Sequence, residues 1–310
     1  MSDKGVEVWS GGVNTWECDE MGHMNVRFWV AKAQEGLAGL AAQLGMPRAF
    51  AADGEATLVV REQHIRFLRE AKAGAGLYMT GGVVELGESH ARLLLVIRHP
   101  SGEPAATFQM LVEHATAKEL RPFPWSARIR ERAEGMRVEV PAFAAARRID
   151  LTPVEATASL PRALELNLQR IGLGVIGPAD CDVHGRMRPE IFIGRVSDGV
   201  ARLFGETRPG PEAAEGEAPA RIGGAVLEYR VLHLAWPEAG DGVELRSGFS
   251  GCDARTRRVI HWMLDPQTGQ AWGSAEAVVI SFDLDKRKVV DISPEAQAAF
   301  LAKCAPGLGL

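Results

Sequence analysis

One short pattern occurs twice in this sequence, and the repeat is its most constraining feature. Residues 18–24 read CDEMGHM and residues 181–187 read CDVHGRM, so Cys-Asp-x-x-Gly-x-Met recurs 163 positions later (181 minus 18). A second set of matches, between residues 62–76 and 228–242, keeps an offset of 166 (228 minus 62). Two stretches in nearly the same register indicate a tandem duplication. Duplicated domains can pack as an internal pseudo-dimer, with a site at their interface.

Length and composition suit two such domains. The chain has 310 residues, enough for two domains of roughly 150 residues, and its net charge of −5 provides no electrostatic footprint for nucleic acid. The four cysteines lack C-x-x-C spacing and the eight histidines lack metal-binding spacing, so we expect a reduced protein without metal or cofactor. The N-terminus has no apolar signal-peptide core and no apolar run reaches transmembrane length. We therefore expect a cytoplasmic protein with no membrane partner.

Each half shows the same order of secondary-structure signals. A strand pattern over residues 6–16 leads into the first motif. A largely apolar helix is predicted over residues 25–44, with Asn25 as its N-cap and Gly45 just past its end. The second copy of this helix is predicted over residues 189–204 and begins with a proline, which suits the first helical turn.

Strand patterns follow each helix, and short turns separate them. They cover residues 57–68, 76–86, 91–98 and 105–114 in the first half, and 225–234, 242–250, 257–264 and 271–282 in the second. Consecutive strands joined by short turns pair antiparallel. We predict an α+β fold of two tandem domains, each an antiparallel sheet wrapped around a long central helix. Gly36 and Gly199 share one helix position, which suggests that a neighbouring backbone approaches closely there.

The segments between these patterns suggest domain boundaries. We expect a first domain over residues 1–120, a linker over 121–159, a second domain over 160–290 and a C-terminal tail over 291–310. The linker contains a charged helical pattern that ends near Pro141. Residues 206–221 are rich in Gly, Pro, Ala and Glu, which is typical of a surface loop.

The residues around both motifs resemble a known family. WECDEMGHMN at 16–25, the aromatic-bearing helix after it and LREAKAGAGL at 68–77 look like the hotdog-fold acyl-CoA thioesterases of the 4-hydroxybenzoyl-CoA thioesterase type. Their signature is approximately D-x-D-x-x-G-H-x-N before the central helix. DCDVHG at 180–185 resembles it too, and Asp180 supplies the first Asp that Glu17 replaces. The resemblance implies a tandem double hotdog that hydrolyses an acyl-CoA to free acid and CoA.

The resemblance also implies roles for the first motif. Thioester hydrolysis needs a base or a carboxylate nucleophile, together with donors for the carbonyl oxygen. Asp19 would be that base or nucleophile, and the Val26 amide in the first helical turn would be a donor. The alternative is that Asp19 only caps a turn. The expected substrate-binding residues are Gly22, His23, Asn25, Val26 and Trp29.

The second copy departs from this pattern at three positions. Arg186 replaces His23 and Arg188 replaces Asn25, while Pro189 stands where the first copy has Val26. Because proline has no backbone N–H, the second copy would lack the carbonyl donor. We therefore favour the first copy as catalytic, with Asp182 either degenerate or active through a shifted register. The two arginines could form structural ion pairs or bind phosphate.

Glu35 is a further catalytic candidate because Asp198 repeats it at the same spacing. An acid buried in an apolar helix would have a raised pKa that suits acid/base work. The alternative is an acid at the helix edge, paired with a neighbour such as Lys32 or Arg195.

Cysteine and tryptophan side chains admit simpler interpretations. Cys18 and Cys181 have no obvious general base, so we interpret them as small fillers rather than nucleophiles. Trp9, Trp16 and Trp29 could line an acyl pocket or belong to the core.

Two other function classes stay open on the same fold. A hydratase or dehydratase acting on an acyl-CoA would carry a Gly-Asp-x-Asn-Pro-x-His string, which does not occur. A non-catalytic acyl-CoA-binding protein is compatible with the weakened second motif. The expected partner is the acyl-CoA itself, and assembly into a homo-oligomer is compatible with the internal pseudo-dimer. Fold alone does not decide among these classes.

Overall fold

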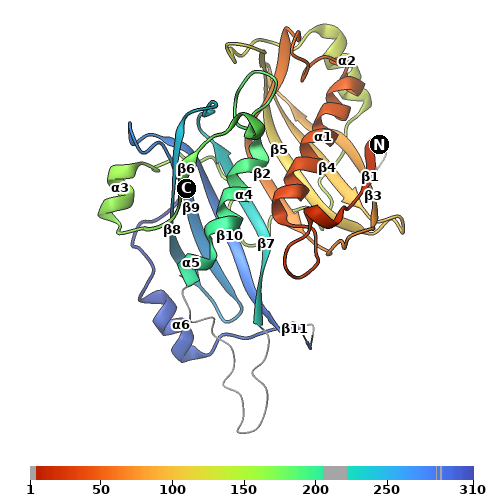
Figure 1. Cartoon of the computed structure of the whole chain (residues 1–310). Helices are drawn as coiled ribbons and strands as arrows, with labels where there is room; N and C mark the ends of the chain where they lie inside the picture. Colours follow the sequence, from red (N-terminus) through yellow and green to blue (C-terminus); the bar gives the residue numbers. More distant parts are fainter. Residues whose placement is uncertain (1–4, 205–221, 284, 287) are drawn as a thin grey trace. The chain divides into compact units, whose positions relative to one another are not determined.

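The computed structural model describes residues 5–204, 222–283, 285–286 and 288–310, so the loop predicted over residues 206–221 lies outside the described residues. The chain forms two compact units (Figure 1). The first comprises Met1–Arg147, Ile176–Gly194 and Trp236–Gly240; the second comprises Arg148–Val175, Arg195–Ala235 and Asp241–Leu310. Both copies of the motif therefore belong to the first unit.

The first unit contains a five-stranded antiparallel sheet. Its strands are β1 (Val6–Gly12), β2 (Ala56–Phe67), β3 (Gly76–Leu86), β4 (His90–Arg98) and β5 (Pro104–Thr116). They are hydrogen-bonded in the order β1-β3-β4-β5-β2. Short turns connect consecutive strands, as the sequence pattern predicts.

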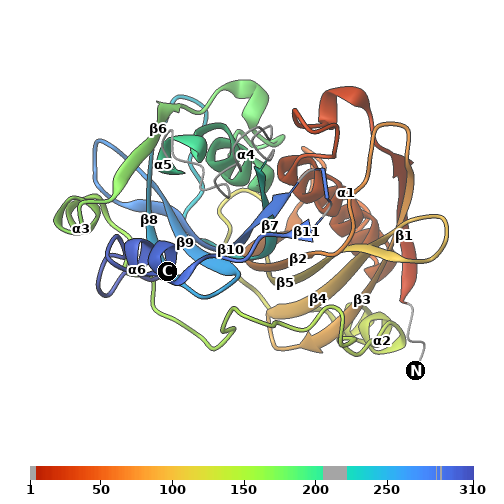
Figure 2. The same ribbon diagram turned by 90° about the horizontal axis from the view of Figure 1, so that it is seen from below.

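Helix α1 (Val26–Leu44) lies on one face of this sheet (Figure 2). Asn25 is its N-cap and accepts a hydrogen bond from the Arg27 amide, while Gly45 ends it with a left-handed φ of 97°. Leu40 of α1 and Leu95 of β4 pack together above Gly81, where a Cβ would lie 2.8 Å from Leu95 Cδ2. The predicted arrangement of a helix wrapped by an antiparallel sheet is confirmed.

The predicted linker covers the opposite face of the same sheet. Helix α2 (Ala127–Gly135) ends earlier than the predicted Pro141, because the chain then pairs with β3: the Val83 amide donates to Met136 O and the Val138 amide to Val83 O. Beyond this point Val138 and Ala144 pack against Leu94 and Val96 of β4. This segment crosses the sheet face away from α1 (Figure 2), so it is part of the first unit's core.

The second unit repeats the pattern. Its strands are β6 (Gln169–Val175), β7 (Ile222–His233), β8 (Gly242–Cys252), β9 (Thr256–Leu264), β10 (Ala271–Asp283) and the short β11 (Lys288–Val289). The order is β7-β10-β9-β8-β6, and β11 pairs with β10. The helices are α3 (Leu160–Glu165), α4 (Pro189–Gly199), α5 (Ala201–Phe204) and α6 (Pro294–Leu301), and α4 belongs to the first unit up to Gly194. Within the described ranges, no helix has the length and apolar character to cross a membrane.

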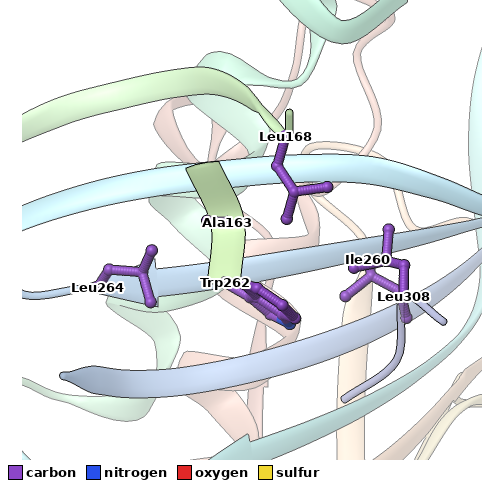
Figure 3. Packing of buried hydrophobic residues seen from close by; sticks show 6 residues of the cluster. All are labelled: Ala163, Leu168, Ile260, Trp262, Leu264 and Leu308. Carbon is purple, nitrogen blue, oxygen red and sulfur yellow. The ribbon is translucent and has the colours of Figure 1, made fainter. Parts of the chain in front are cut away.

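The outer face of the second sheet has its own apolar cluster around Trp262 (Figure 3). Leu168, Ile260 and Leu264 surround the buried indole, and its N–H donates to Gly309 O at 3.0 Å. Leu308 joins the same cluster. The predicted C-terminal tail therefore packs onto the second sheet.

The repeated helix glycine behaves differently in the two copies. Gly199 meets backbone as expected, because a Cβ there would collide with the carbonyl of Ile171 in β6. Gly36 instead faces the side chain of Met79, and Gly39, one turn later, meets the carbonyl of Val8 in β1. The inference of a close backbone approach is correct for Gly199 and wrong for Gly36, because the matching strand contact in α1 has moved by one turn.

Candidate active site

The first motif forms a tight loop closed by its own aspartate. The Asp19 amide donates to His23 O at 2.8 Å, and the Gly22 amide donates to Asp19 O at 3.0 Å. Asp19 Oδ1 accepts the Met21 amide at 2.9 Å and the His23 amide at 3.1 Å. Gly22 has a φ of +77°, which a residue with a side chain rarely adopts. One carboxylate oxygen of Asp19 thus caps the turn, as one interpretation predicts.

The second motif repeats this loop bond for bond. The Asp182 amide donates to Arg186 O at 2.7 Å and the Gly185 amide to Asp182 O at 3.1 Å. Asp182 Oδ1 accepts the His184 amide at 2.8 Å and the Arg186 amide at 3.0 Å. Gly185 has a φ of +83°. The sequence repeat is therefore also a repeat of local structure.

Each motif loop pairs with a segment that belongs to the second set of sequence matches, residues 62–76 and 228–242. His23 pairs with Lys72, and Arg186 pairs with Glu238, in antiparallel bridges. The amide of Met24 donates to Ala71 O at 2.8 Å, and that of Met187 donates to Pro237 O at 2.7 Å. The two registers found in the sequence, 163 and 166, thus belong to segments that contact each other.

The two aspartates differ in their second oxygen. Asp182 Oδ2 lies 3.3 Å from Arg186 Nε and 3.2 Å from Arg186 Nη2, so an arginine neutralises this carboxylate. This supports the ion-pair interpretation of Arg186. Within the described ranges, Asp19 Oδ2 accepts no hydrogen bond from protein. Asp19 therefore keeps an oxygen that a water molecule or a substrate can approach.

The two helices also differ at their first residue. Both helices begin seven residues after the motif aspartate, α1 at Val26 and α4 at Pro189. Asn25 uses its side chain for the Arg27 amide and its carbonyl for the Phe28 amide. No hydrogen bond of the Val26 amide to a described residue is found. At this helix position the first copy thus offers a backbone donor that Pro189 cannot supply in the second copy.

The other predicted substrate-binding residues have structural partners. His23 Nε2 lies 3.2 Å from Glu70 Oε2, which ties the loop to the corner after β2. The Trp29 side chain is buried, its indole N–H donates to Met24 O at 3.1 Å, and its ring meets Phe67 edge-on at 6.4 Å. These contacts favour the core interpretation of Trp29. Trp16, in contrast, is 76% exposed.

A buried ion pair next to the first motif was not predicted. Lys32 Nζ of α1 lies 2.8 Å from Glu17 Oε1, with both side chains largely buried. Glu17 Oε2 also accepts the Asn14 amide at 2.7 Å. The pair joins the chain just before Asp19 to the helix just after it. Two signals were available in the sequence: a lysine in a largely apolar helix, and a Glu at a position where the family has Asp.

A second buried acid stands at the start of α4. Glu190 is 3% exposed and lies 3.3 Å from Arg188 Nε. Burial raises its pKa, while Arg188 and Arg27 act in the opposite direction. Its counterpart in α1 is Arg27, 163 positions earlier (190 minus 27), so the copies carry opposite charges at one helix position. Comparison of the two helix starts in the sequence could have revealed this.

Glu35 does not have the expected environment. Its side chain is exposed and accepts the Trp9 indole N–H at 2.5 Å, and Asp198 is exposed as well. The expectation of an acid buried in an apolar helix is therefore wrong, because this side of α1 faces outward. Lys32, the neighbour considered for Glu35, pairs with Glu17 instead.

The motif cysteines occupy equivalent structural positions. Cys18 Sγ donates to Asn14 O at 3.5 Å and Cys181 Sγ to Gly177 O at 3.4 Å. Burial raises the pKa of the Cys181 thiol, which disfavours a thiolate nucleophile. In the part of the chain that the structure describes, no cluster of three His, Cys, Asp or Glu side chains could hold a metal ion.

Comparisons with known proteins identify the family and the fold. The family model of the thioesterase-like superfamily matches residues 13–133 and 176–300, one segment in each half. No curated protein sequence shows a significant match.

Solved structures with the same fold span nearly the whole chain. A protein named an oleoyl thioesterase from Lactobacillus plantarum has a TM-score of 0.66 at 10% identity, with 90% of this chain and 98% of that chain covered. A 12:0-ACP thioesterase from Umbellularia californica has a TM-score of 0.62 at 12% identity, with coverage of 88% and 93%. An acyl-ACP thioesterase from Bacteroides thetaiotaomicron has a TM-score of 0.60 at 10% identity, with coverage of 87% and 96%. The predicted tandem hotdog fold is thereby confirmed.

Proposed function

Because the chain belongs to the thioesterase-like superfamily, we propose that it is a thioester hydrolase that cleaves an acyl-CoA at the first motif, with Asp19 as general base. One observation carries the choice of motif: the first copy combines an aspartate oxygen and a helix amide that are both free of described partners. In the second copy the equivalent oxygen binds Arg186 and the equivalent residue is Pro189.

The proposed reaction uses these two groups in sequence. Asp19 Oδ2 accepts a proton from a water molecule, whose oxygen forms a bond to the thioester carbonyl carbon. The carbonyl oxygen becomes negative and accepts the Val26 N–H, helped by the positive end of α1. The C–S bond then breaks, and the CoA thiolate takes up the proton held by Asp19. Direct attack by Asp19 as nucleophile would use the same two groups.

Release of free thiol from a panel of acyl-CoA thioesters tests this function. The panel should vary acyl length and include aromatic acyl groups, with matched acyl-ACP conjugates because two structural neighbours are named acyl-ACP thioesterases. Faster turnover of the CoA series supports the proposal. Saturable binding without thiol release would favour the acyl-CoA-binding alternative, and hydration of an enoyl-CoA would favour a hydratase.

Asparagine substitutions test the assignment of the first motif. Asp19→Asn keeps the oxygen that caps the turn but removes the base, so we expect kcat to fall at least about a hundredfold. Asp182→Asn is the matched control because its loop has the same hydrogen bonds, and we expect a much smaller loss. An equal or larger loss of kcat in Asp182→Asn would show that the choice of the first copy as the catalytic one is wrong.

A further inference from the structure

Arg27 directly follows the amide that we assign to the thioester carbonyl, and its side chain is held in a defined place. Its stem crosses Gly194 of α4: a Cβ on Gly194 would lie 2.8 Å from Arg27 Cδ and 3.2 Å from Arg27 Cγ. The counterpart of Gly194 in the first copy is Ala31, 163 positions earlier (194 minus 31). The missing methyl group at Gly194 thus provides the space that Arg27 occupies.

The guanidinium of Arg27 has no acceptor in the described part of the chain. Its carbon lies 5.8 Å from the ring centroid of Phe28, but no hydrogen bond or ion pair of the side chain to a described residue is found. The neighbouring arginines differ: Arg186 binds Asp182, and Arg188 binds Ala179 O at 2.9 Å and Glu190. Arg27 is only partly buried, so a ligand can reach its donors.

Glu190 is an acid on which the charge of Arg27 acts, but the two side chains form no ion pair. The positive charge of Arg27 acts to lower the pKa of Glu190, but the ion-pair partner of Glu190 is Arg188. Because Arg188 is the cation in contact with Glu190, the charge of Arg27 is not neutralised by an ion pair with this acid. A partly buried arginine without an acceptor is suited to a carboxylate, which its planar fork binds through two parallel hydrogen bonds.

We propose that Arg27 selects acyl groups that carry a carboxylate, so that the preferred substrate is the CoA thioester of a dicarboxylic acid. This inference rests on the proposed function, because it places the thioester carbonyl at the Val26 amide. The whole pantetheine arm lies between the thioester carbonyl and the CoA phosphates, so the phosphates are far from this position. The acyl chain, in contrast, begins at the carbonyl carbon itself. An anion beside Arg27 therefore belongs to the acyl group.

Succinyl-CoA and butyryl-CoA form a matched pair for the test. Both have four acyl carbons and the same CoA, and they differ in a terminal carboxylate against a methyl group. For the full-length wild type we expect a higher kcat/KM with succinyl-CoA. Arg27→Gln should lower the succinyl to butyryl ratio of kcat/KM about 10- to 100-fold, the range for loss of a charged hydrogen-bond partner, with butyryl-CoA little changed.

Two further variants separate charge from position. Arg27→Lys keeps the charge and should retain part of the preference. Gly194→Ala keeps Arg27 but fills the space beneath it, so the succinyl to butyryl ratio should fall although alanine suits a helix better than glycine. Arg128→Gln is the control, because Arg128 is an exposed arginine of α2, and should leave the ratio unchanged. These variants decide the question even where Arg27→Gln fails to fold.

The outcomes distinguish this inference from the proposed function. Hydrolysis of both thioesters with a ratio unaffected by Arg27→Gln and Gly194→Ala would overturn the inference alone. Equal losses on both substrates would also overturn it, because they would assign Arg27 to the shared CoA part. A wild-type protein that hydrolyses no acyl thioester would overturn the proposed function and this inference with it.

Discussion

At the residue scale, the first and second helix starts differ in one backbone amide, and a single substitution can test its role. Val26→Pro removes the N–H and exchanges the valine side chain for the proline ring, and the backbone accepts it because Asn25 already has the φ of −63° and ψ of 146° that suit a residue before proline. Proline is also favoured at a first helical position, as α4 shows. We expect kcat to fall about 10²- to 10³-fold, the usual loss for an oxyanion donor. Thiol-release kinetics and a thermal melt would measure it.

The matched control for this experiment is Pro189→Ala in the second copy. It restores an N–H at the equivalent position, but Arg186 still occupies Asp182 Oδ2, so we expect no gain in kcat. A Val26→Pro protein that melts like the wild type and keeps its full kcat would remove the Val26 amide from the mechanism.

His261 predicts a pH dependence of stability. It is buried in the second unit, hydrogen-bonded through Nδ1 to Ser247 Oγ at 2.7 Å, and burial lowers its pKa to about 3. Below the usual His pKa of about 6.5, the unfolded chain takes up a proton that the folded chain refuses. The free energy of unfolding should therefore fall as the pH drops from about 6.5 toward 3, by up to about 1.4 kcal/mol per pH unit.

Urea unfolding between pH 7 and pH 5 would measure this slope. His261→Gln cannot titrate, so its unfolding free energy should depend less on pH than that of the wild type. His90→Gln is the control, because His90 is exposed, and it should keep the wild-type slope. Identical slopes for His261→Gln and wild type would contradict the role of His261.

At the scale of elements, the Glu17–Lys32 pair ties the motif loop to α1. Lys32→Met keeps the length of the side chain but leaves the buried Glu17 carboxylate without its cation. Loss of one partner of a buried ion pair costs about 3–5 kcal/mol, so we expect the unfolding free energy to fall by about that amount. Urea unfolding at pH 7 checks the value.

The double variant Glu17→Gln/Lys32→Met shows whether the loss arises from the pair. Because it leaves no unpaired charge buried, it should recover much of the stability lost in Lys32→Met. If the two losses simply add, the residues do not stabilise the protein as a pair.

At the scale of the whole molecule, the structure predicts how the isolated first half behaves. A fragment of residues 1–121 lacks Val138 and Ala144, which cover Leu94 and Val96 on the outer face of the first sheet. It also lacks residues 176–194, which belong to the first unit. We expect the fragment to self-associate through its uncovered apolar surface and to show little thioesterase activity as a monomer.

Size-exclusion chromatography with light scattering, followed by thiol-release assays of each fraction, would check this prediction. The full-length chain is the control. A monomeric fragment with full activity would contradict a site that needs the second half of the sequence, although the thioesterase assignment itself would stand.

Local signals in the sequence determined the elements and their order. Asn25 and Gly45 delimit α1 because a cap and a left-handed residue act within one helical turn. The strands follow from stretches of β-branched and apolar residues bounded by turn residues, which are also local signals. The duplication revealed both motif loops, since identical residues at equivalent positions form identical hydrogen bonds.

Only the tertiary structure decided which groups are paired and which are free. Glu35 lies in an apolar helix but is exposed, and Lys32 is buried against Glu17, fifteen residues earlier in the chain. Gly194 meets Arg27 across 167 positions (194 minus 27). Burial and ion pairing depend on distances between segments far apart in sequence, and no local pattern encodes those distances.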